Sequence, residues 1–173
     1  MFPFILYEER KSKRYSSEKT HQRLTVLHCG ENSCAVSQSG IELGYLLVNN
    51  QLMLNDSDLD GAANYRSTSL AAIIHGEKSS LAQWIRGKRS FGSLLEKYGY
   101  STVPSPAHPN PEGETYFSGG YNLEQHSAFS GKVITGIQVE LPTGLREDDN
   151  KRKKFAQAFV DSILEYLKYL GLG

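Results

Sequence analysis

The sequence contains little cysteine, no excess of one charge and no long apolar run. Its two cysteines, Cys29 and Cys34, are too few for a disulfide framework. Nineteen basic and nineteen acidic side chains give a formal net charge of zero, so no overall positive field would attract nucleic acid. No apolar stretch approaches the roughly 20 residues that cross a bilayer, and the apolar start is too short for a signal peptide. We therefore expect a cytoplasmic protein with no nucleic-acid partner and no membrane partner.

What the sequence does contain is typical of one globular domain. The chain has 173 residues, of which 39% are apolar and 22% are charged. A chain of this length can bury about 70% of its unfolded surface, so it needs no disulfide or metal to hold a core together. Residues 1–20 are charged and show no sustained period, which predicts a loose N-terminal arm.

Three segments are rich in β-branched and apolar residues and predict strands. They cover 23–29 (RLTVLHC), 41–48 (IELGYLLV) and 133–141 (VITGIQVEL). The third is apolar almost throughout, which is the pattern of a strand buried on both faces.

Four segments predict helices: 67–74, 79–85, 90–99 and about 150–170. The second and third each begin at a capping serine and stop at a glycine. The last carries an apolar stripe at helical spacing. Strands that alternate with helices favour an α/β sheet with helical cover over an all-β sandwich.

Residues 100–121 carry four prolines and the Gly119-Gly120 pair, too many breakers for a regular element. A loop of this length in a compact domain usually lines a site, and a disordered stretch is the alternative. The aromatic and apolar content of the segment favours order.

Glu140 is the first candidate for chemistry. It stands near the carboxyl end of the most apolar strand, which is where α/β folds present reacting groups. Burial there would raise the pKa of a carboxyl group and suit a general base. The alternative is a side chain that simply reaches solvent past Pro142.

The segment 116–122 (YFSGGYN) is the second candidate. Its adjacent glycines allow backbone N–H groups to approach a ligand and to adopt positive φ, although a tight turn between aromatic residues would look the same. His126 follows, and a single histidine is more often a hydrogen-bonded loop residue than a ligand or base.

Two patterns near the N-terminus weakly suggest a metal. His28 and Glu31 have the H-x-x-E spacing of paired zinc ligands, which chance produces easily. Cys29 and Cys34 lack a second ligand pair at finger spacing, so ordinary thiols are the simpler interpretation.

Several segments taken together resemble the C-terminal portion of N-formylglutamate amidohydrolase-like proteins. They are IELGYLL at 41–47, RGKRSFGSLLEKYGYSTVPSPAHPNP at 86–111, YFSGGYN at 116–122 and GIQVELP at 136–142. The resemblance covers about residues 41–170. It divides the chain into a poorly matched arm, 1–40, and an amidohydrolase-like domain, 41–173.

The resemblance implies a partial phosphorylase/hydrolase-like three-layer fold, with a mixed sheet and helices on its faces. It also implies a zinc-dependent amidohydrolase that cleaves small N-acyl amino acid amides. Glu140 would then be the catalytic base, and a small-molecule amide the partner. Substrate binding would fall to Gly119, Gly120, Tyr121, Asn122 and His126.

The chain also departs from the family pattern. VSQSG (36–40) stands where family members carry a zinc-ligand histidine, while Ala71 and Gln125 occupy positions where arginines are expected. Zinc is therefore implied without ligands that can be placed, and activity would be impaired. The alternatives are a non-catalytic scaffold or binding relative, and a partial gene product.

Overall fold

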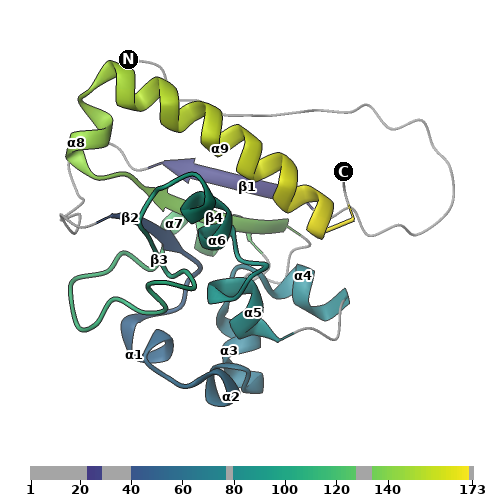
Figure 1. Ribbon diagram of the computed structural model, residues 1–173. Coiled ribbons are helices and arrows are strands. Elements are labelled where there is room, and N and C mark those ends of the chain that lie inside the picture. Colours follow the sequence, from purple (N-terminus) through teal and green to yellow (C-terminus); the bar gives the residue numbers. More distant parts are fainter. Residues whose placement is uncertain (1–22, 29–39, 77–79, 128–133, 172–173) are drawn as a thin grey trace, which may run out of the picture.

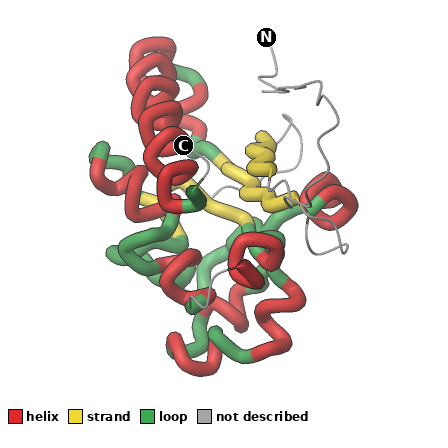
Figure 2. Tube along the Cα trace, turned by 90° about the vertical axis from the view of Figure 1, so that its right-hand side faces the viewer, coloured by secondary structure: helices red, strands yellow, loops and turns green. Residues whose placement is uncertain are grey.

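The computed structural model describes residues 23–28, 40–76, 80–127 and 134–171. These residues form an α/β fold in which helices cover a four-stranded mixed sheet (Figure 1). The side view in Figure 2 shows helices on both sides of the strands. The α/β class predicted from the sequence is confirmed.

The strands are β1 (Arg23–His28), β2 (Ile41–Gly44), β3 (Thr102–Val103) and β4 (Ile134–Glu140), in the spatial order β1-β4-β2-β3. β4 pairs in parallel with β1 and in the antiparallel sense with β2, which pairs in parallel with β3. β4 is thus an interior strand and is buried from its second residue onward, as its apolar sequence predicts.

The described helices are short except for the last. They are α1 (Asn49–Leu52), α2 (Asp56–Leu59), α3 (Ala62–Ser67), α4 (Ala71–Gly76), α5 (Leu81–Arg86), α6 (Phe91–Lys97), α7 (Tyr121–His126), α8 (Thr143–Arg146) and α9 (Asp149–Tyr169). The capping serines perform as predicted, because the side chains of Ser80 and Ser90 accept hydrogen bonds from the first turns of α5 and α6.

The hydrophobic core lies between one face of the sheet and the helices α5, α6 and α9. Alternate residues of β2 and β4 point into it, among them Leu43 and Val139. Rings from three helices meet edge to face, since Tyr166 of α9 contacts both Trp84 and Phe91. In the part of the chain that the structure describes, no helix is both long and apolar enough to cross a membrane.

The second predicted strand is too long by four residues. β2 ends at Gly44, and Leu46 adopts a positive φ of 62°. The reason is tertiary: the N–H of Leu46 donates to the carbonyl of Ser118, outside the sheet. The segment 45–48 therefore leaves the sheet.

The predicted helix 67–74 is also wrong in its first half, because α4 begins at Ala71. Thr68 and Ser69 instead bond to the end of β2, where both donate to the carbonyl of Tyr45. The Ser69 hydroxyl also donates to Gly136 of β4 at 2.7 Å. These contacts with distant segments of the chain hold residues 68 and 69 outside the helix.

The predicted loop 100–121 is irregular apart from the two residues of β3, which the sequence did not predict, and Tyr121, which begins α7. A strand this short carries no detectable alternation, and pairing with β2 defines it.

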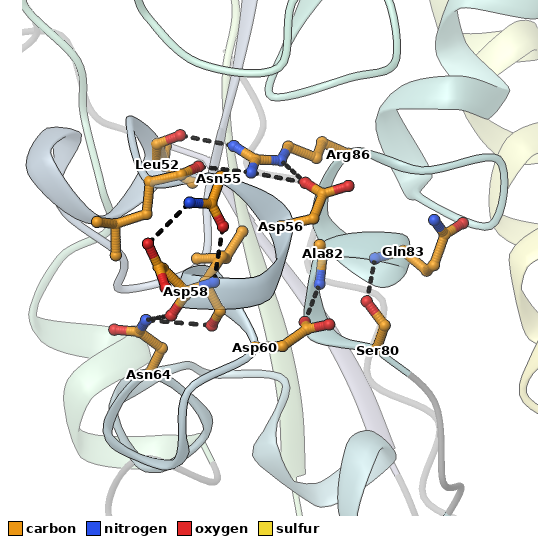
Figure 3. A network of polar contacts seen from close by, with 12 residues as sticks. Leu52, Asn55, Asp56, Asp58, Asp60, Asn64, Ser80, Ala82, Gln83 and Arg86 are labelled. Carbon is orange, nitrogen blue, oxygen red and sulfur yellow. Dashed lines mark hydrogen bonds and ion pairs between the residues drawn. The ribbon is translucent and has the colours of Figure 1, made fainter.

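A polar network holds the small helices α1, α2, α3 and α5 together (Figure 3). Arg86 is only 9% exposed and donates to the carbonyls of Leu52 and Leu54 as well as to Asp56. Asp60 accepts from the backbone N–H of Ala82 at the start of α5.

Candidate functional site

Two buried carboxylates face each other across adjacent strands. Glu42 of β2 is directly opposite Glu140 of β4 in the antiparallel register, and Gly44 is opposite Gln138. Opposed residues of such a ladder share a face, and side chains alternate along each strand. Glu42, Gln138 and Glu140 therefore lie on the face of the sheet that looks away from the hydrophobic core.

Glu140 is buried rather than directed into bulk water. Its side chain is 2% exposed, and Oε1 accepts a hydrogen bond of 2.8 Å from the amide nitrogen of Gln138. The alternative in which this side chain reaches solvent past Pro142 is thus wrong. The physical reason is that Glu140 is still the last residue of an interior strand, inside the sheet rather than beyond it.

The glycine turn, defined as Ser118–Gly120, covers this face. A Cβ placed on Gly44 would lie 2.8 Å from the backbone nitrogen of Gly119, so the turn rests directly on β2. A Cβ on Gly120 would lie 3.4 Å from Oε1 of Gln138, the residue that bonds to Glu140. Gly119 has a φ of +131°, as expected for one of these glycines, whereas Gly120 has a φ of −134°.

The remaining predicted binding residues belong to α7, which packs against β4 through the buried Leu123. Tyr121 is 72% exposed, and Asn122 and His126 are also exposed. Gly119 and Gly120 thus lie beside the buried pair, while these three side chains lie on the outer surface of α7. Their role in substrate binding stays a prediction.

Glu42 is the residue of this site that sequence reasoning missed. It is 1% exposed, and its Oε2 accepts a hydrogen bond of 2.9 Å from the backbone N–H of Phe117. Burial raises the pKa of the adjacent Tyr116, and the nearby carboxylate of Glu42 raises it further. The available signal was a glutamate inside the apolar run IELGYLL, the same signal that identified Glu140.

The described residues do not fit the zinc that the family resemblance implies. A catalytic zinc takes three protein ligands, and within the described ranges no group of three His, Cys, Asp or Glu side chains could hold a metal. His28 is the last residue of β1, and its backbone lies opposite Val139 of β4. Glu31, Cys29 and Cys34 lie outside the described residues. No step below is therefore derived through a metal.

Comparisons with protein-family models, with curated proteins and with solved structures found no match to this chain. The functional argument consequently rests on the geometry of the site.

Proposed function

We propose that the chain hydrolyses the amide bond of a small N-acyl amino acid, with Glu140 as the general base. The observation that carries the proposal is the position of Glu140. It is a buried carboxylate at the end of an interior strand, opposite Glu42 and linked through Gln138 to the glycine turn. A general base must hold a proton acceptor in fixed geometry, and this side chain is fixed by a hydrogen bond inside the sheet.

The reaction assigned to Glu140 is proton removal from an attacking water molecule. The water oxygen bonds to the amide carbon, and its proton passes to the Glu140 carboxylate. The same carboxyl group then returns the proton to the amide nitrogen as the carbon–nitrogen bond breaks, which releases the acid and the amine and leaves no net proton on the residue. Backbone N–H groups of the glycine turn are suited to face the developing oxyanion, because no Cβ shields them.

The burial of Glu140 has a consequence for access. At 2% exposure its oxygens meet a substrate only when the covering chain gives way. The glycine turn approaches the side chain of Gln138, and its glycines tolerate backbone rearrangement that other residues resist.

A second candidate function is ligand binding without catalysis. It is favoured by the burial of Glu140, which is 2% exposed and so is shielded from a substrate unless the covering chain moves. In that case the site would hold a small amide without cleaving it.

The test is an amidase assay of the full chain on N-acyl amino acids that differ in acyl group, with and without added zinc. Glu140→Gln keeps the size of the side chain and removes its basicity, so kcat should fall by about 10²- to 10⁴-fold. Glu124→Gln, on the exposed surface of α7, is the matched control and should keep full activity. Activity that survives in Glu140→Gln would contradict the proposal. A substrate-dependent rise in Tm without hydrolysis would establish the binding function instead.

A further inference from the structure

Three hydrogen bonds among the described residues tie the segment 116–118 to β2 and the residues that follow it. The hydroxyl of Tyr116 donates to the carbonyl of Leu43 at 2.5 Å. The N–H of Phe117 donates to Oε2 of Glu42 at 2.9 Å. The N–H of Leu46 donates to the carbonyl of Ser118 at 2.6 Å. The segment that leads into the glycine turn is thus fixed at each of three consecutive residues.

The contact made by Glu42 differs from the other two. Its acceptor is a side-chain oxygen that reaches out from the sheet, whereas the other two acceptors are backbone carbonyls. Among the three contacts, this is the one made by a side chain on the same face of the sheet as Glu140. Glu42 is directly opposite Glu140 in the strand register. Glu42 therefore connects the backbone immediately before the glycine turn to the strand position across from the proposed base.

We infer that Glu42 is a positioning residue: its carboxylate seats the glycine turn against Gln138 and so shapes the site around Glu140. Gly44 makes this seating possible, because a Cβ there would collide with the backbone of Ser118 and Gly119. The inference rests on the proposed function for its catalytic consequence, whereas the seating itself can be measured without any substrate.

Two variants separate positioning from proton chemistry. Glu42→Gln keeps an acceptor oxygen at the same distance from the backbone but cannot act as a carboxylate in proton transfer. Glu42→Leu fills similar space and removes the acceptor. If Glu42→Leu fails to fold, Glu42→Asp serves in its place, because one methylene less withdraws the carboxylate from the N–H of Phe117. Glu114→Leu, at an exposed position of the same loop, is the control.

The measurement is amide hydrogen exchange at Phe117, followed by NMR in the full chain. We expect slow exchange in wild type, Glu42→Gln and Glu114→Leu, and exchange at least about tenfold faster in Glu42→Leu or Glu42→Asp. Equal exchange rates at Phe117 in wild type and Glu42→Leu would overturn the inference, whether or not the protein hydrolyses an amide.

The kinetic arm tests the catalytic consequence. Rescue is the expected result: Glu42→Gln should keep kcat within about threefold of wild type, while Glu42→Leu loses at least about tenfold. If Glu42→Gln loses as much activity as Glu42→Leu while Phe117 stays protected, the carboxylate serves proton transfer and not position. A wild-type protein without amidase activity would remove the proposed function and leave the exchange result to decide the seating.

Discussion

Arg86 and Glu42 both use a buried charged side chain to hold irregular backbone, but in different electrostatic settings. Arg86 donates to two carbonyls at the turn between α1 and α2, and Asp56 lies 2.7 Å from its guanidinium (Figure 3). Glu42 accepts from the backbone N–H of Phe117 and stands opposite a second acidic side chain, Glu140. The helical region therefore places an acidic side chain beside its buried arginine. The face of the sheet that carries the candidate site instead places two acidic side chains opposite each other.

This difference separates a structural role from a chemical one. Arg86 supplies donors to backbone carbonyls that would otherwise lack them, so its role is structural. The pair of Glu42 and Glu140 instead places two carboxyl groups on one face of the sheet, and carboxyl groups are side chains that can take up and release a proton. A buried acidic side chain is thus most informative about function when the residue opposite it on the adjacent strand is also acidic.

Replacing Arg86 should produce the largest effect. Arg86→Met keeps the aliphatic packing but leaves the buried carbonyl of Leu52 and the carbonyl of Leu54 without their donor. We expect a loss of about 3 kcal/mol in unfolding free energy, mainly from these carbonyls, because Asp56 is 65% exposed and its ion pair contributes little. Urea denaturation measures the change. Arg66→Met, at an exposed position of α3, should change stability by less than about 0.5 kcal/mol, and an equal loss there would contradict the role given to Arg86.

Gly44→Ala tests the other side of the comparison. The new Cβ would lie 2.8 Å from backbone atoms of Ser118 and Gly119, which cannot yield as a flexible side chain would. We expect a loss of about 2 kcal/mol, together with displacement of the glycine turn. Gly144→Ala in α8 is the matched control, since nothing lies within 4 Å of its Cβ position, and it should be neutral or slightly stabilising. A neutral Gly44→Ala would mean that the turn does not rest on β2.

Sequence reasoning succeeded where the determining interactions are local. The starting points of α5 and α6 follow from Ser80 and Ser90, whose side chains accept hydrogen bonds from backbone N–H groups in the first turn. The apolar character of β4 needs no knowledge of its neighbours, and the same is true of the apolar stripe on α9.

Sequence reasoning failed where contact with a distant segment determines the local structure. β2 stops at Gly44 because Leu46 bonds to Ser118, a partner that no local pattern reveals. Glu42 was overlooked for the same reason. Its sequence context resembled that of Glu140, but only the strand register shows that the two residues are opposed. Register between segments far apart in the chain is a property of sheet order, which a single sequence does not specify.

A pair of tyrosine variants sharpens the comparison for uncharged groups. The hydroxyl of Tyr116 donates to Leu43, whereas the buried hydroxyl of Tyr166 has no hydrogen-bond partner among the described residues. Tyr116→Phe should cost about 1 kcal/mol, and Tyr166→Phe should be neutral or stabilise by up to about 1 kcal/mol, because it removes an unsatisfied polar atom and keeps the ring. Opposite signs in urea denaturation would support this assignment. Equal losses would show that Tyr166 also holds a partner.

Asp148 provides the exposed counterpart of Glu42, and the smallest expected effect. Its carboxylate accepts hydrogen bonds from the backbone N–H groups of Asn150 and Lys151 at the start of α9. The hydrogen bond from Lys151, supported by that from Asn150, lowers the pKa of Asp148 below its usual value. Because the folded pKa is the lower one, the stabilisation is present above the unfolded pKa of about 3.9 and is lost as pH falls through the folded value.

Asp148→Asn keeps an acceptor oxygen and removes the titration. The urea midpoint of wild type should therefore fall more steeply between about pH 5 and pH 2 than that of Asp148→Asn, while Asp161→Asn, which caps no helix end, should follow the wild-type curve. Parallel curves for wild type and Asp148→Asn would mean that the charge adds nothing to an exposed hydrogen bond of this kind. In that case the burial of the hydrogen bond between Phe117 and Glu42, rather than a charge on its acceptor, would account for any stability of that bond.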